Sequence, residues 1–148
     1  MEAIKYNNYD FSLVHNCNFS NVYFNKHLKL ALCIAERDYI PIDNFKAIFT
    51  TISKLIDDFP IQHLVFDKRK LRTFHQPSME WYFAIWKPTV KDKGLTNHYK
   101  ILPDLDWFVK SVEAGRHEIL KKYSNAFLNG ISINYVNSIE DAIVMILE

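Results

Sequence analysis

Seven apolar side chains recur with the period of an α-helix between residues 45 and 59. They fall on one helical face: Phe45, Ile48, Phe49, Ile52, Leu55, Ile56 and Phe59. Asp43 is suited to cap the start of this helix, and Pro60 is suited to stop it. The short apolar run that follows, His63–Asp67, is typical of a buried strand. A strand pattern directly after a strongly amphipathic helix restricts the chain to folds in which helices cover a sheet.

The same alternation continues along the chain. Strand patterns are predicted at residues 9–13, 22–24, 28–35, 63–67, 98–102 and 131–135, and helical patterns at 43–59, 77–87, 104–123 and 138–147. Strands that alternate with helices form parallel sheets. The chain is therefore predicted to be α/β, with a mixed, mostly parallel sheet, opened by an antiparallel hairpin, and about four helices packed on it. One domain over residues 1–148 fits the length, with its core at about 20–148 and a strand-like extension over 1–19.

Charge and composition argue against several classes of function. Lys and Arg number 18 and Asp and Glu number 17, which gives a formal net charge of +1, whereas nucleic-acid binding favours a strongly basic face. The N-terminus lacks the apolar core of a signal peptide, and the longest apolar run is too short to cross a bilayer. We therefore predict a cytoplasmic protein with no nucleic-acid partner and no membrane span.

A basic loop follows the strand at 63–67. Its sequence, KRKLRTFHQPS, places four cations in the first five positions. The loop lies at the carboxyl end of a predicted parallel strand, where ligands bind, and it leads into a helix whose first N–H groups attract anions. An anion site is therefore predicted, with these candidate residues: Lys68, Arg69, Arg72, His75 and Ser78. The alternative is a solvated loop whose cations cover nearby apolar surface with their stems.

His75 is the residue in this loop best suited to acid–base catalysis, because histidine titrates near neutral pH. No local motif supplies a partner to position it, and Ser78 lacks the glycine-rich turn that exposes a nucleophilic serine. His15 and Cys17 are two types of metal ligand close together, but two ligands do not make a site. The sequence therefore predicts no catalytic residue, no metal and no cofactor.

The helix predicted at 77–87 is apolar almost all round. Its core-facing stripe consists of Met79, Tyr82, Phe83 and Trp86. Trp81 and Ile85 fall on a neighbouring face and are the candidate interface residues, for a partner protein or for a second copy of this chain in a homodimer. The alternative is that the long helix at 104–123 covers them.

The order of these elements resembles the STAS domain, and most closely its SpoIIAA-like branch, which also shades into the lipid-binding Sec14 group. The resemblance covers about residue 20 to the C-terminus. It rests on the element order, on Leu64-Val65-Phe66-Asp67 and on the closing helix from Ser138 to Leu147. Regulatory STAS domains carry an Asp-Ser-Ser/Thr-Gly turn after this strand, and its Ser is phosphorylated. Here Thr73 and Ser78 are the only hydroxyls in that region, and neither lies in such a turn.

Three functions follow as hypotheses. The resemblance implies a non-enzymatic regulatory module that binds another protein or itself. Its Sec14 side implies instead a binding module for an anionic or amphiphilic, lipid-like small molecule, which needs an apolar cavity with cations at its mouth. The third is a small enzyme that uses His75, which needs this histidine bonded to a carboxylate inside a cleft.

Overall fold

The computed structural model describes residues 3–123 and 129–148. Over these residues the strands are β1 (Ala3–Tyr6), β2 (Tyr9–Asn16), β3 (Ser20–Asn25), β4 (Leu30–Ala35), β5 (His63–Asp67), β6 (Asn97–Ile101) and β7 (Ser132–Tyr135). The helical elements are α1 (Ile42–Asp58), α2 (Gln76–Glu80), η1 (Trp81–Trp86), α3 (Lys87–Lys91), α4 (Asp106–Lys122) and α5 (Ile139–Leu147). Because α2, η1 and α3 follow one another without a break, the helices form four bodies.

The seven strands form a single mixed sheet in the order of the sequence, from β1 to β7. The pairs from β1 to β4 are antiparallel, and the pairs from β4 to β7 are parallel. The α/β class and the mixed sheet with about four helices were predicted from the sequence. The antiparallel part is larger than the predicted hairpin, because three of the six strand pairs are antiparallel. The predicted N-terminal extension supplies the edge strand β1 and its neighbour β2, and Phe11 of β2 is fully buried.

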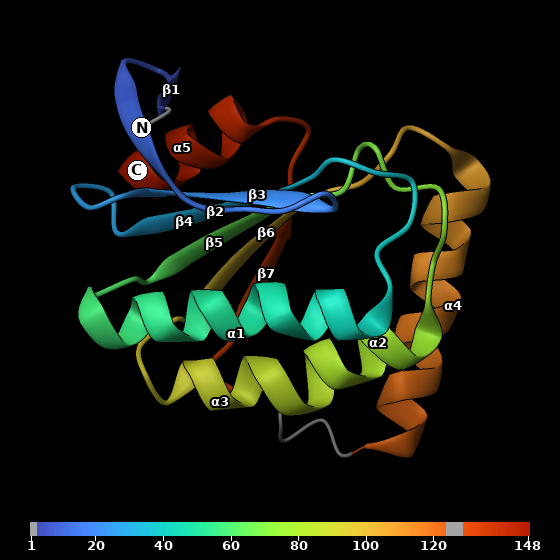
Figure 1. Ribbon diagram of the computed structural model, residues 1–148. Helices are drawn as coiled ribbons and strands as arrows, with labels where there is room; N and C mark the ends of the chain where they lie inside the picture. The colour runs from blue at the N-terminus through green and yellow to red at the C-terminus, as the bar shows by residue number, and fades with distance from the viewer. Residues whose placement is uncertain (1–2, 124–128) are drawn as a thin grey trace.

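The strand order explains how the helices divide between the two faces. Each parallel connection moves one strand further in the same direction, and right-handed crossovers then place all the connecting helices on one face. Figure 1 shows α1 and the α2–η1–α3 segment side by side beneath the sheet, α4 at the end of this layer, and α5 on the opposite face.

The helical layer buries the larger of two apolar clusters. The stripe predicted for α1 packs into it, with Phe45, Ile48, Phe49, Ile52 and Ile56 buried. Asp43 lies in the first turn of α1, and Pro41, not Asp43, occupies the capping position. The predicted stripe Met79, Tyr82, Phe83 and Trp86 is also buried in this cluster.

The opposite face is covered by α5 and by the β1–β2 hairpin. The helix begins at a serine cap, in which Ser138 Oγ accepts the N–H of Asp141 at 3.0 Å. Ile139 and Ile143 of α5 pack in the same cluster as Val65 of β5. This second cluster is smaller, and it brings together residues of the N-terminal hairpin and of the C-terminal helix.

The helix that starts near Pro77 does not end at Pro88, and the prediction that it stops there was wrong. The helical segment continues through Lys91. Its middle turn, η1, is a π-helix in which the N–H of Lys87 bonds to the carbonyl of Tyr82, five residues back. A proline normally clashes with the carbonyl four residues before it. The wider π turn displaces these carbonyls, which explains how the segment accommodates Pro88.

None of the helices described by the structure combines the length and the apolar character needed to cross a bilayer.

Candidate functional site

The basic loop after β5 does not gather its cations into one site. Lys68 is buried against the helical layer, where its Nζ lies 3.7 Å from Sδ of Met79. Arg69 turns back to Asp67, and its Nε and Nη2 donate to the two carboxylate oxygens at 3.0 Å and 2.7 Å. Arg72 donates to two loop carbonyls, both at 2.8 Å. The predicted anion-site residues Lys68 and Arg69 therefore make contacts in different directions.

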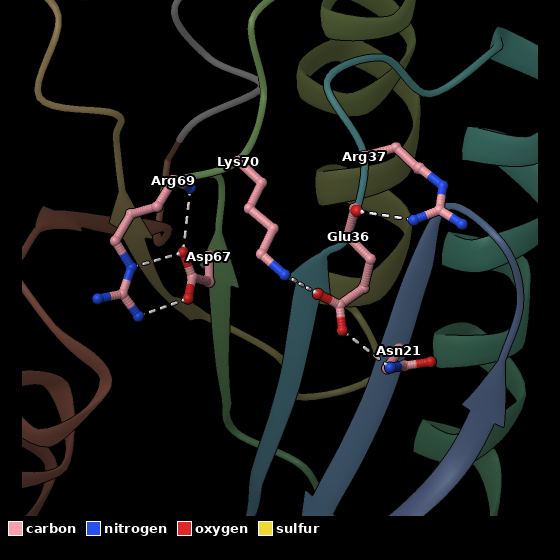
Figure 2. A network of polar contacts seen from close by, with 6 residues as sticks. All are labelled: Asn21, Glu36, Arg37, Asp67, Arg69 and Lys70. Carbon is pink, nitrogen blue, oxygen red and sulfur yellow. Dashed lines mark hydrogen bonds and ion pairs between the residues drawn. The ribbon is translucent and has the colours of Figure 1, made fainter.

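Carboxylates hold two of the loop cations at the ends of β4 and β5 (Figure 2). Lys70 Nζ donates to Glu36 Oε1 at 2.8 Å, and Asn21 Nδ2 donates to Glu36 Oε2 at 3.0 Å. In the same view the remaining guanidinium nitrogen of Arg69 points away from Asp67. Arg69 thus keeps one end of its side chain available to a further acceptor.

His75 and Ser78 do come together, as a helix cap. His75 Nδ1 accepts the backbone N–H of Ser78 at 3.3 Å and lies 2.8 Å from the Ser78 hydroxyl. Pro77 lies in the first turn of α2, as predicted. These contacts start the helix, and the hydrogen bonds of His75 among the described residues include none to a carboxylate.

Three lysines are buried between the sheet and the α2–η1–α3 segment, and we call Lys68, Lys87 and Lys100 the lysine cluster. Lys87 Nζ and Lys100 Nζ lie 4.1 Å and 3.9 Å from the centroid of the Phe83 ring. The same two nitrogens lie 4.8 Å and 5.2 Å from the centroid of Tyr82, and Lys68 Nζ lies 5.9 Å from it. Aromatic rings attract cations, so Tyr82 and Phe83 favour the charged forms of these amines.

Strand alternation and the π turn bring the cluster together. Lys100 is the register partner of Phe66, so both side chains face the helical layer, as does His98 two positions earlier. Lys87 follows η1 directly and is bonded through its N–H to Tyr82. Short π segments within helices often occur at functional sites.

The lysine cluster and the side chains packed around it contain more hydrogen-bond donors than acceptors. Lys87 Nζ, Lys100 Nζ, the Tyr82 hydroxyl and both ring nitrogens of His98 are buried and have no hydrogen-bond partner among the described residues. None of the ion pairs in the described part of the chain involves a lysine of this cluster. Buried polar groups are normally satisfied. A ligand with several acceptor oxygens is the chemical complement of such a group.

Burial lowers the pKa of each lysine in the cluster. The pKa of Lys68 falls to about 8, with the Cys33 thiol opposing the shift in part. Burial, and then the charges of the neighbouring lysines, lower the pKa of Lys87 and Lys100 well below the usual value. A contact between these two amines favours the charged form of Lys87 and the neutral form of Lys100. Burial, followed by the same two charges, also lowers the pKa of His98.

A pocket of about 490 Å³ opens beside the cluster, at the carboxyl ends of the parallel strands. Its lining consists of Arg69, Lys100, Leu102, Pro103, Asp104, Val109, Tyr135, Val136 and Asn137. A second pocket of about 380 Å³ shares Leu102, Val109 and Tyr135 with it and adds Val112, Glu113 and Arg116. Carboxyl ends of parallel strands are where α/β folds bind ligands, so this pocket is the candidate site.

No family of known proteins, no curated protein and no solved structure matches the chain. Within the described part of the chain, no three His, Cys, Asp or Glu side chains are grouped so that they could hold a metal ion.

Sequence reasoning found Arg69 but missed Lys87, Lys100, Tyr82 and His98 as members of a site. One feature of the sequence did point to this site. His98 and Lys100 alternate with Tyr99 and Ile101 in a strand that helices cover, and a charged residue at such a position needs a special reason. No comparable pattern in the sequence indicates that Lys87 lies beside Lys100, because this contact depends on the π turn.

Proposed function

We propose that this protein is a binding module for a small anionic ligand with an apolar part, held in the pocket at the carboxyl ends of β5, β6 and β7. One observation carries the proposal. Lys100, whose buried amine has no hydrogen-bond acceptor among the described residues, lines this pocket together with Arg69.

The anionic character follows from the charges around the pocket. Burial lowers the pKa of Lys100 most, and Lys87, Lys68 and Arg116 lower it further, so the neighbours that act on its charge are basic. Asp104 is the carboxylate in the pocket lining. An oxyanion that bound beside Lys100 would provide the acceptors that these buried amines lack.

The size and walls of the pocket favour an amphiphilic ligand. About 490 Å³ lies within the range typical of small-molecule sites. Leu102, Pro103, Val109 and Val136 supply apolar wall, while Arg69 and Lys100 supply charge. A ligand that combines an acidic end with a hydrocarbon part matches both.

The two other hypotheses from the sequence have weaker support. A module that binds a protein, or itself, rests on Trp81 and Ile85, of which Ile85 is 54% exposed. An enzyme that uses His75 needs a carboxylate partner for this residue, whereas its Nδ1 is engaged with Ser78 as the cap of α2.

The proposal is tested by calorimetric titration with octanoate, which has an acidic end and a hydrocarbon chain. We expect one site per chain. Lys100→Met should weaken binding at least about tenfold, because a hydrogen bond to a charged group contributes roughly 1.5–3 kcal/mol. Lys54→Met, which removes an exposed lysine on α1, is the matched control and should bind as the wild type does.

Octylammonium and 1-octanol have the same chain without the negative charge. Binding of either as tightly as octanoate would remove the argument for an anionic ligand. Undiminished octanoate binding by a folded Lys100→Met protein would place the ligand elsewhere.

A further inference from the structure

Lys87 and Lys100 form a pair of buried amines. Their nitrogens lie over the Phe83 ring at 4.1 Å and 3.9 Å, and the two side chains contact one another. They arrive from different elements, Lys87 from α3 and Lys100 from β6. Of the two, only Lys100 lines the pocket of about 490 Å³. Lys100 is therefore the residue of the pair that forms part of the pocket wall, while its amine, like that of Lys87, is buried beside the Phe83 ring.

We propose that Lys100 forms an imine with a carbonyl group of the bound ligand, which makes the ligand a carbonyl-bearing acid such as a 2-oxo acid. This inference rests on the proposed function, because the same pocket must bind the acid first. It names the class of ligand and adds a covalent step to binding.

The step balances with the groups present. The neutral amine of Lys100 attacks the carbonyl carbon, a C–N bond forms, and one amine proton passes to the carbonyl oxygen. The ammonium of Lys87 then donates a proton to the resulting hydroxyl, which leaves as water. The product is a protonated imine on Lys100 and a neutral amine on Lys87, so the positive charge is conserved.

The surroundings of Lys100 favour this assignment. The groups that face it are Lys87 on α3, Lys68 at the end of β5, Arg116 on α4, His98 on its own strand and Tyr82 on η1. Cations next to a desolvated lysine keep its amine unprotonated and nucleophilic. Burial lowers the pKa of both amines, and the contact between them opposes this shift for Lys87 and adds to it for Lys100. Lys87 is therefore the amine that takes up a proton when an anion binds.

Burial of the two amines favours the imine product as well as the nucleophilic form of Lys100. Both amines are almost completely shielded from solvent, and exclusion of water protects reactive intermediates from hydrolysis. The lysine stem has four carbons and is flexible, so Nζ of Lys100 can turn from its buried position toward the pocket, whose lining includes this residue. Arg69 lines the same pocket and has a nitrogen directed away from Asp67, available to the acid group of the ligand.

The test uses 2-oxooctanoate, which differs from octanoate by the carbonyl group. The protein is incubated with it, reduced with borohydride and weighed by mass spectrometry. An imine gives an added mass equal to that of the ligand acid less one oxygen atom, and peptide mapping should place it on Lys100. Octanoate should give no added mass under the same conditions.

Variants separate the roles of the two lysines. Lys100→Arg keeps a cation but cannot form an imine, and it should abolish the label. Lys87→Met removes the proton donor and the neighbouring charge, and it should slow labelling at least about 100-fold, the lower end of the effect of a positioned acid. Lys54→Met should label at the wild-type rate.

The outcomes distinguish the two proposals. If octanoate binds but 2-oxooctanoate leaves no label on Lys100, the imine is wrong and the binding module stands. If neither acid binds and no label forms, both are wrong. A label spread over exposed lysines would also overturn the imine, and mapping on the wild-type chain decides this even if a variant fails to fold.

Discussion

Gly115 of α4 lies directly against the ring of Phe74. A methyl group placed on this glycine would overlap the ring and the side-chain amide of Gln76, and Gln76 Nε2 donates to the carbonyl of Gly115 at 3.2 Å. α4 runs without a break from Asp106 to Lys122 through this glycine. Its missing side chain is what allows the loop before α2 to approach the helix.

We expect Gly115→Ala to destabilise the protein by about 1–3 kcal/mol, as overpacked sites do. In an open helix the same change would stabilise by up to about 1 kcal/mol, so the sign is diagnostic. Urea unfolding measures the change. Phe74→Leu in the same chain should recover part of the loss, and a stabilising Gly115→Ala would contradict the close approach.

The pair formed by Asp67 and Arg69 should contribute more to stability than its exposed neighbour. The Asp67 side chain is 6% exposed and takes two bonds from Arg69, so Arg69→Ala leaves a buried carboxylate without its main partner. We expect a loss of roughly 2–3 kcal/mol. Lys70→Ala breaks the largely exposed pair with Glu36 and should cost under about 1 kcal/mol. Equal losses in chemical denaturation would contradict the difference.

Lys68→Met should stabilise the protein, and the gain should shrink as the pH rises. The pKa of Lys68 is about 8 in the folded chain, against 10.5 for an ordinary lysine. Below pH 8 the folded state carries the full cost of protonating this amine, roughly 3 kcal/mol, and above the unfolded pKa the cost disappears. Between pH 7 and 9.5 the stability difference between variant and wild type should therefore fall by roughly 2 kcal/mol.

Lys54→Met serves as the control for that series, because its side chain is exposed, and its effect should not vary with pH. A gain from Lys68→Met that stays constant from pH 7 to 9.5 would show that the amine is not titrating differently in the folded state.

Binding of octanoate at neutral pH should be accompanied by proton uptake. An anion beside Lys87 and Lys100 favours their charged forms, and the pKa of both is lowered in the free protein. Titrations in two buffers of different ionisation enthalpy measure the protons taken up. Uptake should be lost in Lys87→Met, and binding without any uptake would mean that the amines are already charged.

The homodimer predicted from Trp81 and Ile85 has a clear test. Trp81 packs against Phe45 of α1, with 6.1 Å between ring centroids, while Ile85 is largely exposed. We expect Ile85→Glu to dissociate the dimer with little change in stability, as surface substitutions usually do. Sedimentation across micromolar concentrations gives the mass, and a wild type that stays monomeric throughout would end the homodimer prediction.

Much of the fold could be predicted because its signals are local. The stripe from Phe45 to Ile56 specifies α1, and Ser138 specifies the start of α5. The continuation of the helix past Pro88 was missed, since a π turn is a property of the folded segment. The tight contact at Gly115 was missed because it joins two elements far apart in the sequence.

The candidate site was harder to predict than the fold. A run of four cations after β5 attracted attention, yet two of them pair with nearby carboxylates. The lysines that matter for the proposals, Lys87 and Lys100, are single residues in apolar surroundings. Their meeting depends on strand register and on the wide turn of η1, neither of which a composition or a local motif records.

The contact that closes the second face of the sheet spans almost the whole chain. Asn7 Nδ2, in the turn between β1 and β2, donates to the carbonyl of Glu140 in α5 at 3.1 Å, across 133 positions. During synthesis the residues of the helical layer emerge before those of α5, so that layer can assemble early on the ribosome. On the opposite face of the sheet, Val65, Tyr99 and Ile101 lack the covering side chains of α5 until that helix has been made. A nascent chain therefore carries an apolar sheet surface that only the β1–β2 hairpin covers, and only in part, during this interval.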